Sequence, residues 1–331
     1  MRRVGAPGRV GRRVRRGARV IPVVLAGALL AACSLVGGGA AAPATPTPTP
    51  RTGPAETRTG VAYATTDPAQ VLDLHLPAGD GHRVFPLVVL IHGGGFLEGA
   101  PADEAGLAAT LNADGFAAAS LGYRLSGRAP FPAALQDVKA AVRYVRANAR
   151  GWGVDPDRIA VFGESAGGYL ASMIGATAGE TTFDDDALGN PGVSGAVRAV
   201  VSWFGPADFG TMDDQARENG CDDAAQQHHA PDSPESAWLG SPLPDVPDRV
   251  EEASVVRHVG TARSLPPYLL VHGTQDCTVA PGQSQQLHDA LAARGAKVTL
   301  TMVDGAAHSD PKIFDEQTGP TLQFLHSVLD A

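Results

Sequence analysis

From residue 59 onward the sequence alternates short apolar runs with segments of helical periodicity, and this alternation limits the possible folds more than any other feature. The runs FPLVVLI at 85–91 and RIAVFG at 158–163 are apolar almost throughout, which is typical of strands buried on both faces of a sheet. Four further runs of this kind occupy residues 115–123, 198–205, 267–273 and 297–303. Strands that alternate with helices predict an α/β fold, in which helices cover both faces of a mostly parallel central sheet.

The remaining segments differ in their periodicity. Residues 71–77 alternate leucine with polar residues, as expected of an early strand with one wet face. Residues 131–149 predict a helix that covers the sheet, with an apolar stripe formed by Leu135, Val138, Val142 and Val145. A last helix is expected within 316–331, although Gly319-Pro320 should delay its start.

Residues 206–263 interrupt the alternation with a long segment rich in Asp, Pro and other polar residues. Long insertions between core strands commonly carry function, and we expect this one to form a partial lid. Its His228-His229 pair and acidic runs lack the ligand spacing of a metal site, so they are interpreted as solvated surface. No metal ion is expected.

The N-terminus has the composition of an export signal. Eight arginines precede residue 33, and VIPVVLAGALLAA follows them, an apolar run that Pro22 interrupts and that is too short to span a bilayer. Because the run ends in LAAC, which resembles a bacterial lipobox, residues 1–32 are predicted to be a lipoprotein signal peptide and Cys33 the site of lipid attachment. The alternative is a plain secretory signal. Either way the protein is expected outside the cytoplasm, anchored to the outer face of the bacterial membrane or secreted.

A Thr/Pro-rich stretch follows this signal. Residues 33–58 contain a Thr-Pro repeat and much Gly and Ala, a composition typical of an extended, disordered tether. The folded domain is therefore expected at residues 59–331.

Charge and cysteine content limit the partners and the compartment. The formal charge is −9 although eight arginines lie before residue 33, so the rest of the chain is acidic and unsuited to binding nucleic acid. Beyond Cys33, Cys221 and Cys277 remain as an even pair, and an oxidising location favours a disulfide bond between them. Two buried free thiols are the alternative, because bonding depends on the separation of the Cα atoms.

The stretch FGESAGGYLA at 162–171 places Ser165 between a predicted strand and a predicted helix. A serine held at such a junction by the small neighbours Gly163 and Gly167 is typical of a nucleophile elbow. A small residue in a Gly-rich loop is the alternative. A nucleophile also needs a base and an orienting acid.

Candidates for the acid and the base follow in the chain. Asp276 comes after the run YLLVHG and His308 comes after the last predicted strand, so both lie at C-terminal strand ends, where ligands gather in open parallel sheets. Asp304 and Asp310 also flank His308, but residues that close in sequence are more often turn formers. Of the other histidines, His272 and His288 are interpreted as structural.

The motif HGGGF at 92–96 follows the strand predicted at 85–91. Glycines at this position allow backbone N–H groups to approach a developing oxyanion, which side chains would obstruct. A tight structural turn is the alternative, but the loop, the elbow, the acid and the base occur together in the order Ser, Asp, His.

These segments, together with YRLSGRAPFPAALQDVKAAVRYVRAN, VDPDRIAVFGESAGGYLA, VHGTQD and GAAH, resemble the α/β-hydrolase superfamily. The resemblance is strongest to hormone-sensitive-lipase-like and bacterial feruloyl-esterase-like carboxylesterases, and it spans most of residues 61–329. It implies that His92 positions its loop, and it implies a site with Ser165 as nucleophile, Asp276 as acid, His308 as base, and the backbones of Gly93, Gly94 and Ala166 as oxyanion hole. Many such esterases have an N-terminal helical cap, whereas here the 206–263 insertion is the main expected cover.

The expected function is that of a serine carboxylesterase, which hydrolyses carboxylic esters through an acyl-enzyme intermediate and requires no cofactor. Its substrate would be a small-molecule or polysaccharide-linked ester. Two alternatives remain: a serine peptidase of the prolyl-oligopeptidase-like kind, and a non-catalytic cell-surface binding protein that keeps the hydrolase fold.

Overall fold

The computed structural model describes residues 47–222 and 227–330. The predicted signal peptide, the predicted lipidation site at Cys33 and the part of the predicted tether up to residue 46 lie outside the described residues. Among the helices of the described part, none is long and apolar enough to cross a membrane.

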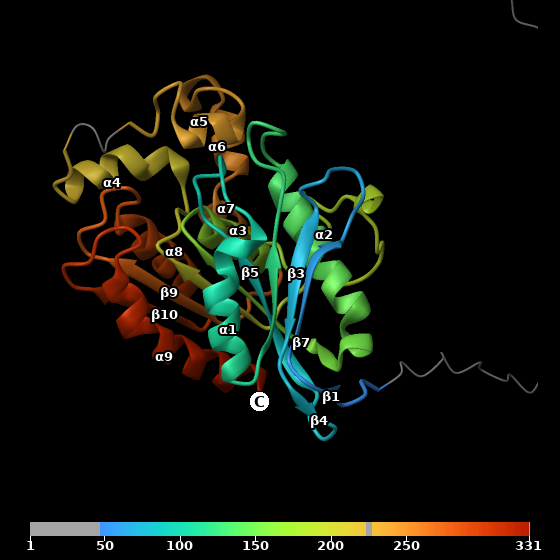
Figure 1. The fold of residues 1–331 in the computed structure, drawn as a ribbon. Coiled ribbons are helices and arrows are strands. Elements are labelled where there is room, and N and C mark those ends of the chain that lie inside the picture. The colour runs from blue at the N-terminus through green and yellow to red at the C-terminus, as the bar shows by residue number, and fades with distance from the viewer. Residues whose placement is uncertain (1–46, 223–226, 331) are drawn as a thin grey trace, which may run out of the picture. The chain divides into compact units, whose positions relative to one another are not determined.

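The described residues form one eight-stranded sheet and a two-stranded ribbon (Figure 1). The ribbon pairs β1 (Thr52–Gly53) with β4 (Gly79–Asp80). The sheet contains β2 (Glu56–Ala62), β3 (Val71–Leu76), β5 (Phe85–Ile91), β6 (Ala117–Leu121), β7 (Val154–Glu164), β8 (Ala199–Trp203), β9 (Tyr268–Gly273) and β10 (Val298–Val303). Its order is β10-β9-β8-β7-β5-β6-β3-β2, in which β3 pairs antiparallel with β2 and β6 and the other pairings are parallel. The predicted α/β architecture is confirmed.

Helices cover both faces of this sheet (Figure 1). One face packs against α1 (Ala105–Ala113) and α9 (Pro311–Leu329), and the other packs against α2 (Ala133–Asn148), α3 (Ala166–Ala176), α7 (Val255–Thr261) and α8 (Gly282–Ala293). Strand β5 shows why both faces are covered. Leu87, Val89 and Ile91 lie in the core on the side of α2 and α3, whereas Val88 and Leu90 lie in the core on the side of α1 and α9. A strand buried on both sides therefore has no polar position.

The remaining helices are short. They are α4 (Met212–Glu218), α5 (Pro234–Leu239) and α6 (Pro247–Glu252), with 3-10 turns at Pro101–Glu104, Ala149–Trp152, Asp186–Leu188, Phe209–Thr211 and Leu243–Asp245. The predicted lid, residues 206–263, thus contains several helices. Two of its helices contribute to the core that includes α2 and α3: α5 supplies Trp238 and Leu239, and α7 supplies Val255 and Val259.

Two expectations about boundaries and one about burial are wrong. The fold begins before residue 59, because β1 and β2 include residues assigned to the tether; β2 is an exposed edge strand, which needs few apolar side chains. Strand β10 was expected to be buried on both faces, but it is the opposite edge of the sheet and among its residues only Val303 is buried. Helix α9 is not delayed by Gly319-Pro320: it begins at Pro311, after the N-cap Asp310. Pro320 is solvent-exposed, so water can bind the carbonyl that its missing N–H leaves free.

Candidate active site

Ser165 occupies the junction between β7, which ends at Glu164, and α3, which begins at Ala166. Its backbone has φ 53° and ψ −120°, a strained conformation for a residue with a side chain. The strain is maintained by pairing on both sides, because Ser165 N donates to Trp203 O (2.9 Å) and Tyr169 N donates to Ser165 O (3.1 Å). The predicted strand–serine–helix turn is confirmed.

Two glycines are required for this turn to close. A Cβ atom at Gly163 would lie 2.1 Å from Gly167 O, and one at Gly167 would lie 1.9 Å from Ile91 O. Both distances are far below van der Waals contact, so no side chain fits at either position. Helix α3 therefore packs with its backbone directly against the ends of β5 and β7.

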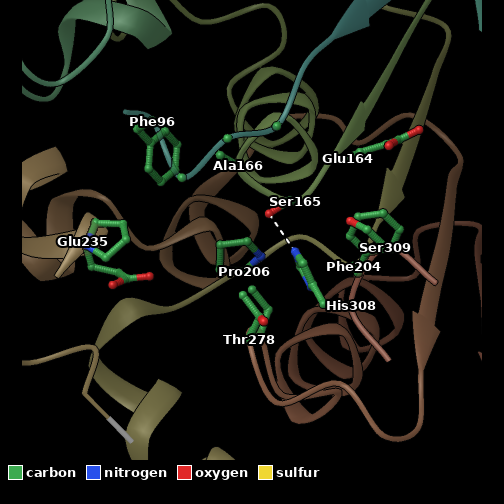
Figure 2. A pocket seen from close by; sticks show the side chains of 15 residues that line it. Phe96, Glu164, Ser165, Ala166, Phe204, Pro206, Glu235, Thr278, His308 and Ser309 are labelled. Atoms are coloured by element: carbon green, nitrogen blue, oxygen red, sulfur yellow. Dashed lines mark hydrogen bonds between the residues drawn. The ribbon is translucent and has the colours of Figure 1, made fainter. Parts of the chain in front are cut away.

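The structure brings the three distant residues together. His308 Nε2 lies 3.0 Å from Ser165 Oγ, and His308 Nδ1 lies 2.6 Å from Asp276 Oδ2 (Figure 2). Ser165 follows β7, Asp276 follows β9 and His308 follows β10, so the three loops meet at the carboxyl edge of parallel strands. Neither Asp304 nor Asp310 replaces Asp276: Asp304 accepts from Thr274, and Asp310 caps α9.

Asp276 is fully buried and fully hydrogen-bonded. Its Oδ1 accepts from the backbone N–H groups of Thr278 and Val279, both at 2.9 Å, and its Oδ2 lies 3.3 Å from His272 Nε2. Burial alone would raise the pKa of Asp276, but hydrogen bonds from His272 and His308 outweigh it and hold the pKa at about 2. The carboxylate is therefore ionised at neutral pH and can orient the His308 ring.

Two residues of this arrangement were not predicted as site residues. His272, interpreted as structural, contacts Asp276 and also bonds to Val279 O and Ser284 Oγ, both at 2.7 Å. Phe204 packs edge-on against the His308 ring, with centroids 4.9 Å apart. Both lie at the carboxyl ends of predicted strands, and that position is the signal that could have found them.

The loop after β5 lies beside the serine. A Cβ atom at Gly93 would be 3.3 Å from Ser165 Cβ and 3.1 Å from Glu164 O, which measures how closely the loop approaches the elbow. His92 holds the loop: its Nδ1 donates to Gly93 O (2.8 Å) and its ring stacks on Tyr123, with centroids 4.3 Å apart. Tyr123 Oη in turn donates to His92 O (2.9 Å), so Tyr123 holds the first residue of the motif HGGGF in place.

A cavity of about 290 Å³ opens above Ser165. Its wall includes the Gly93–Phe96 loop, the start of α3, Phe204, and Pro234 and Glu235 of the predicted lid (Figure 2). Part of the 206–263 insertion therefore covers the site, as expected. Phe96 closes the cavity on one side and stacks on the buried Trp238, with centroids 4.3 Å apart.

Glu164, which also lines the cavity, directly precedes the serine. Burial raises its pKa to about 8, and the negative charge of Glu104 adds to the shift. The Glu104 carboxyl is itself buried, which raises its pKa to about 7. Glu164 is therefore mainly neutral at pH 7.

His228 is not solvated surface, contrary to the sequence analysis. It is buried, with Nδ1 2.7 Å from Asp213 Oδ1 and Nε2 3.0 Å from Thr278 O. Asp213 lies in the same insertion, 15 positions before His228, so this hydrogen bond joins two parts of the insertion to each other. The contact of His228 Nε2 with Thr278 O attaches the insertion to the loop that carries Asp276.

A disulfide bond between Cys221 and Cys277, with Cα atoms 5.6 Å apart, makes a second attachment. The expected pairing is confirmed. Cys277 adjoins Asp276, and Asn219 Nδ2 donates to Asp276 O (3.2 Å), so the segment after α4 holds the acid loop from two points.

We expect the double variant Cys221→Ser/Cys277→Ser to lose about 2–4 kcal/mol of unfolding free energy, because the bond closes a loop of 56 residues in the unfolded chain. Denaturant unfolding with and without a reducing agent measures this loss. The reductant should destabilise the wild-type protein and leave the double variant unchanged. Equal stability of the two proteins without reductant would contradict the prediction.

Comparison with known proteins now places the chain. The family model BD-FAE matches residues 72–291, which begin within β3, end within α8 and include both Ser165 and Asp276. The chain belongs to the BD-FAE family. Among solved structures, this BD-FAE member is similar to a truncated form of a carbohydrate esterase from gut microbiota, with TM-score 0.70 and 31% identity over 85% of this chain and 100% of that one.

Two further relatives of this BD-FAE protein are informative. The acetyl ester-xyloside bifunctional hydrolase of Caldicellulosiruptor lactoaceticus has TM-score 0.64 and 25% identity, covering 84% of this chain and 97% of that one. Esterase LipC of Mycobacterium tuberculosis is 28% identical over 266 residues, 80% of this chain. The BD-FAE chain spans 62% of the length of LipC.

Proposed function

We propose that this protein is a serine carboxylesterase. The observation that carries the proposal is the continuous line of contacts from Asp276 Oδ2 through His308 to Ser165 Oγ, at 2.6 and 3.0 Å, in an open cavity. A serine within hydrogen-bond reach of an imidazole that a carboxylate orients is the arrangement that acyl transfer requires. The esterase names of its relatives support the same reaction.

The steps follow from the geometry. His308 Nε2 takes the proton of Ser165 Oγ as that oxygen attacks the ester carbonyl carbon, and it then gives the proton to the leaving alcohol oxygen. Asp276 fixes the tautomer that carries hydrogen on Nδ1 and stabilises the imidazolium. Water, activated by the same imidazole, then releases the acid from the acyl-enzyme.

Backbone groups would stabilise the oxyanion. We assign this role to the N–H groups of Gly93, Gly94 and Ala166, because the loop of the first two lies against the elbow and Ala166 is the first residue of α3. The positive end of a helix dipole favours negative charge at this position.

The substrate class is proposed from the cavity and the relatives. A cavity of about 290 Å³ accommodates a small acyl group. Two relatives are named for carbohydrate and acetyl ester hydrolysis, so we propose short acyl esters, including acyl groups on carbohydrates.

Hydrolysis of p-nitrophenyl acetate, butyrate and octanoate, compared with cleavage of peptide p-nitroanilides, tests the reaction class. We expect efficient turnover of the short esters and negligible amide cleavage. Efficient amide cleavage with little ester turnover would favour the peptidase alternative, and inactivity on both would favour a binding protein.

We further propose that the protein is exported and anchored through lipid on Cys33, or secreted. The Cys221–Cys277 bond supports an oxidising location, because disulfides persist outside the cytoplasm. Metabolic labelling with a fatty-acid probe, with Cys33→Ser as control, tests the anchor.

Glu164 predicts a specific pH dependence of activity. With its pKa at about 8, Glu164 is neutral at pH 7 and gains a negative charge above pH 8, on the residue that directly precedes the nucleophile. Negative charge in this wall of the cavity opposes the negative charge that develops in the transition state. The rate of the wild-type enzyme should therefore decline above pH 8 relative to that of Glu164→Gln, whose side chain does not ionise. Profiles of kcat/KM from pH 6 to 10 are measured for both proteins. The ratio of the Glu164→Gln value to the wild-type value should rise several-fold above pH 8, and parallel profiles would contradict the prediction.

A further inference from the structure

Glu235 lies at the boundary of two cavities. It lines the cavity above Ser165 and also a second cavity of about 840 Å³, and the two share Pro234, Thr278 and His308. Figure 2 shows its carboxylate extending from α5 toward the centre of the first cavity. The residue thus belongs to the lid part of the insertion but faces the reacting groups.

Within the part of the chain that the structure describes, one oxygen of the buried Glu235 carboxyl lacks a hydrogen-bond partner. The residue is 8% exposed, and among the described residues its Oε2 atom has no hydrogen-bond partner. The neighbouring Ser233 hydroxyl donates to His228 O (2.7 Å), so its single hydrogen is not directed at Oε2. Because an unpartnered buried carboxyl costs folding free energy, such a group indicates a missing donor from a ligand.

The position of His308 shows which part of the ester this donor belongs to. His308 gives its proton to the leaving alcohol oxygen, so the alcohol must lie on the imidazole side of the site. The second cavity opens on that side, since His308, Ala307 and Thr278 form part of its wall. Its other polar lining residues include Asp232 and Gln275, which are exposed and able to accept hydrogen bonds.

We propose that Glu235 is a specificity-determining residue that accepts a hydrogen bond from a free hydroxyl on the alcohol part of the ester. This inference rests on the proposed esterase function and deepens it: the preferred leaving group is a polyol or sugar that carries a hydroxyl close to the esterified oxygen. A hydroxyl placed there gives Glu235 Oε2 its partner, whereas a purely alkyl leaving group leaves the carboxyl unsatisfied.

Two acetates of the same chain length test this inference. Propyl acetate and 2,3-dihydroxypropyl acetate differ in two hydroxyl groups, and kcat/KM is measured for both with the wild-type protein, Glu235→Met and Glu235→Gln. We expect the wild-type protein to prefer the dihydroxypropyl ester, and Glu235→Met to reduce that preference about 10-fold or more, because the hydrogen bond to the buried carboxyl oxygen is lost. Glu235→Gln keeps one acceptor oxygen and should lose less.

Controls separate this role from a structural one. Glu251→Met alters an exposed glutamate of α6 in the same insertion and should change neither rate. Thermal unfolding of Glu235→Met should show a Tm no lower than that of the wild-type protein, because the variant removes an unsatisfied carboxyl. Equal losses on both acetates, a lowered Tm with reduced rates, or unchanged rates on both would overturn the proposal.

Two other outcomes distinguish the possible failures. A wild-type protein that hydrolyses p-nitrophenyl acetate but does not prefer the dihydroxypropyl ester, or that prefers acetylcholine to it, overturns the inference while the esterase function stands. A wild-type protein inactive on all these esters overturns the esterase function, and the inference with it.

Discussion

Ser165→Ala should lower kcat for p-nitrophenyl acetate by about 10⁴- to 10⁶-fold and leave the fold intact. The variant lacks the hydroxyl that lies 3.0 Å from His308 Nε2, so no covalent acyl-enzyme can form. The rate that remains would come from the oxyanion donors and from substrate binding alone. The Tm should change little, because within the described part of the chain the removed hydroxyl makes a side-chain hydrogen bond with His308 alone.

Covalent labelling provides an independent measurement for this variant. A fluorophosphonate probe reacts with an activated serine, and peptide mapping should place the label on Ser165 in the wild-type protein and nowhere in Ser165→Ala. Equal rates for the two proteins, or a label on another serine, would refute the assignment of the nucleophile.

Asp276→Asn should lower kcat by about 10⁴-fold at neutral pH. The amide can donate a hydrogen bond to His308 Nδ1 and so favours the wrong tautomer, and it cannot stabilise the imidazolium. Asp304→Asn is the matched control, because Asp304 lies close to His308 in sequence but accepts from Thr274 at an exposed position. Comparable losses in the two variants would show that Asp276 has no special role.

The same variant should alter the acid sensitivity of the fold. The pKa of Asp276 is held at about 2, below its usual 3.8, so the folded state favours the ionised carboxylate. This preference contributes about 2 kcal/mol of stability, which is fully present above pH 3.8 and is lost as the pH falls through 2. Unfolding free energies from pH 2 to 7 should therefore vary less with pH in Asp276→Asn than in the wild-type protein.

Local chemistry made the centre of the site predictable from sequence. The strand before Ser165, the small residues around it and the order Ser, Asp, His each reflect a requirement of the turn or of acyl transfer, and the structure places Asp276 and His308 at hydrogen-bond distance. The parallel sheet was predictable because strands such as 85–91 are apolar at every position, and only burial on both faces favours that pattern.

The features that sequence did not predict depend on neighbours far along the chain. Strand β10 has an apolar sequence, but its place at the edge of the sheet leaves it half exposed. His272 looks like any histidine in a strand until the fold places it 3.3 Å from Asp276. Likewise, Glu235 lies in a polar stretch that resembles surface, and only tertiary packing shows that its carboxyl is buried in the cavity wall.

The direct backbone contact between Gly167 and Ile91 fixes the positions of the oxyanion donors before substrate binds. The amide groups assigned to the oxyanion come from two segments, one after β5 and one at the start of α3, and this contact locks those segments to each other without any intervening side chain. Their relative spacing is thus set when the sheet folds, before an ester arrives, so that no free energy is spent on rearranging dipoles during the reaction. Sequence variation in the overlying helices can therefore change which alcohol is accepted while the machinery for charge stabilisation keeps its shape.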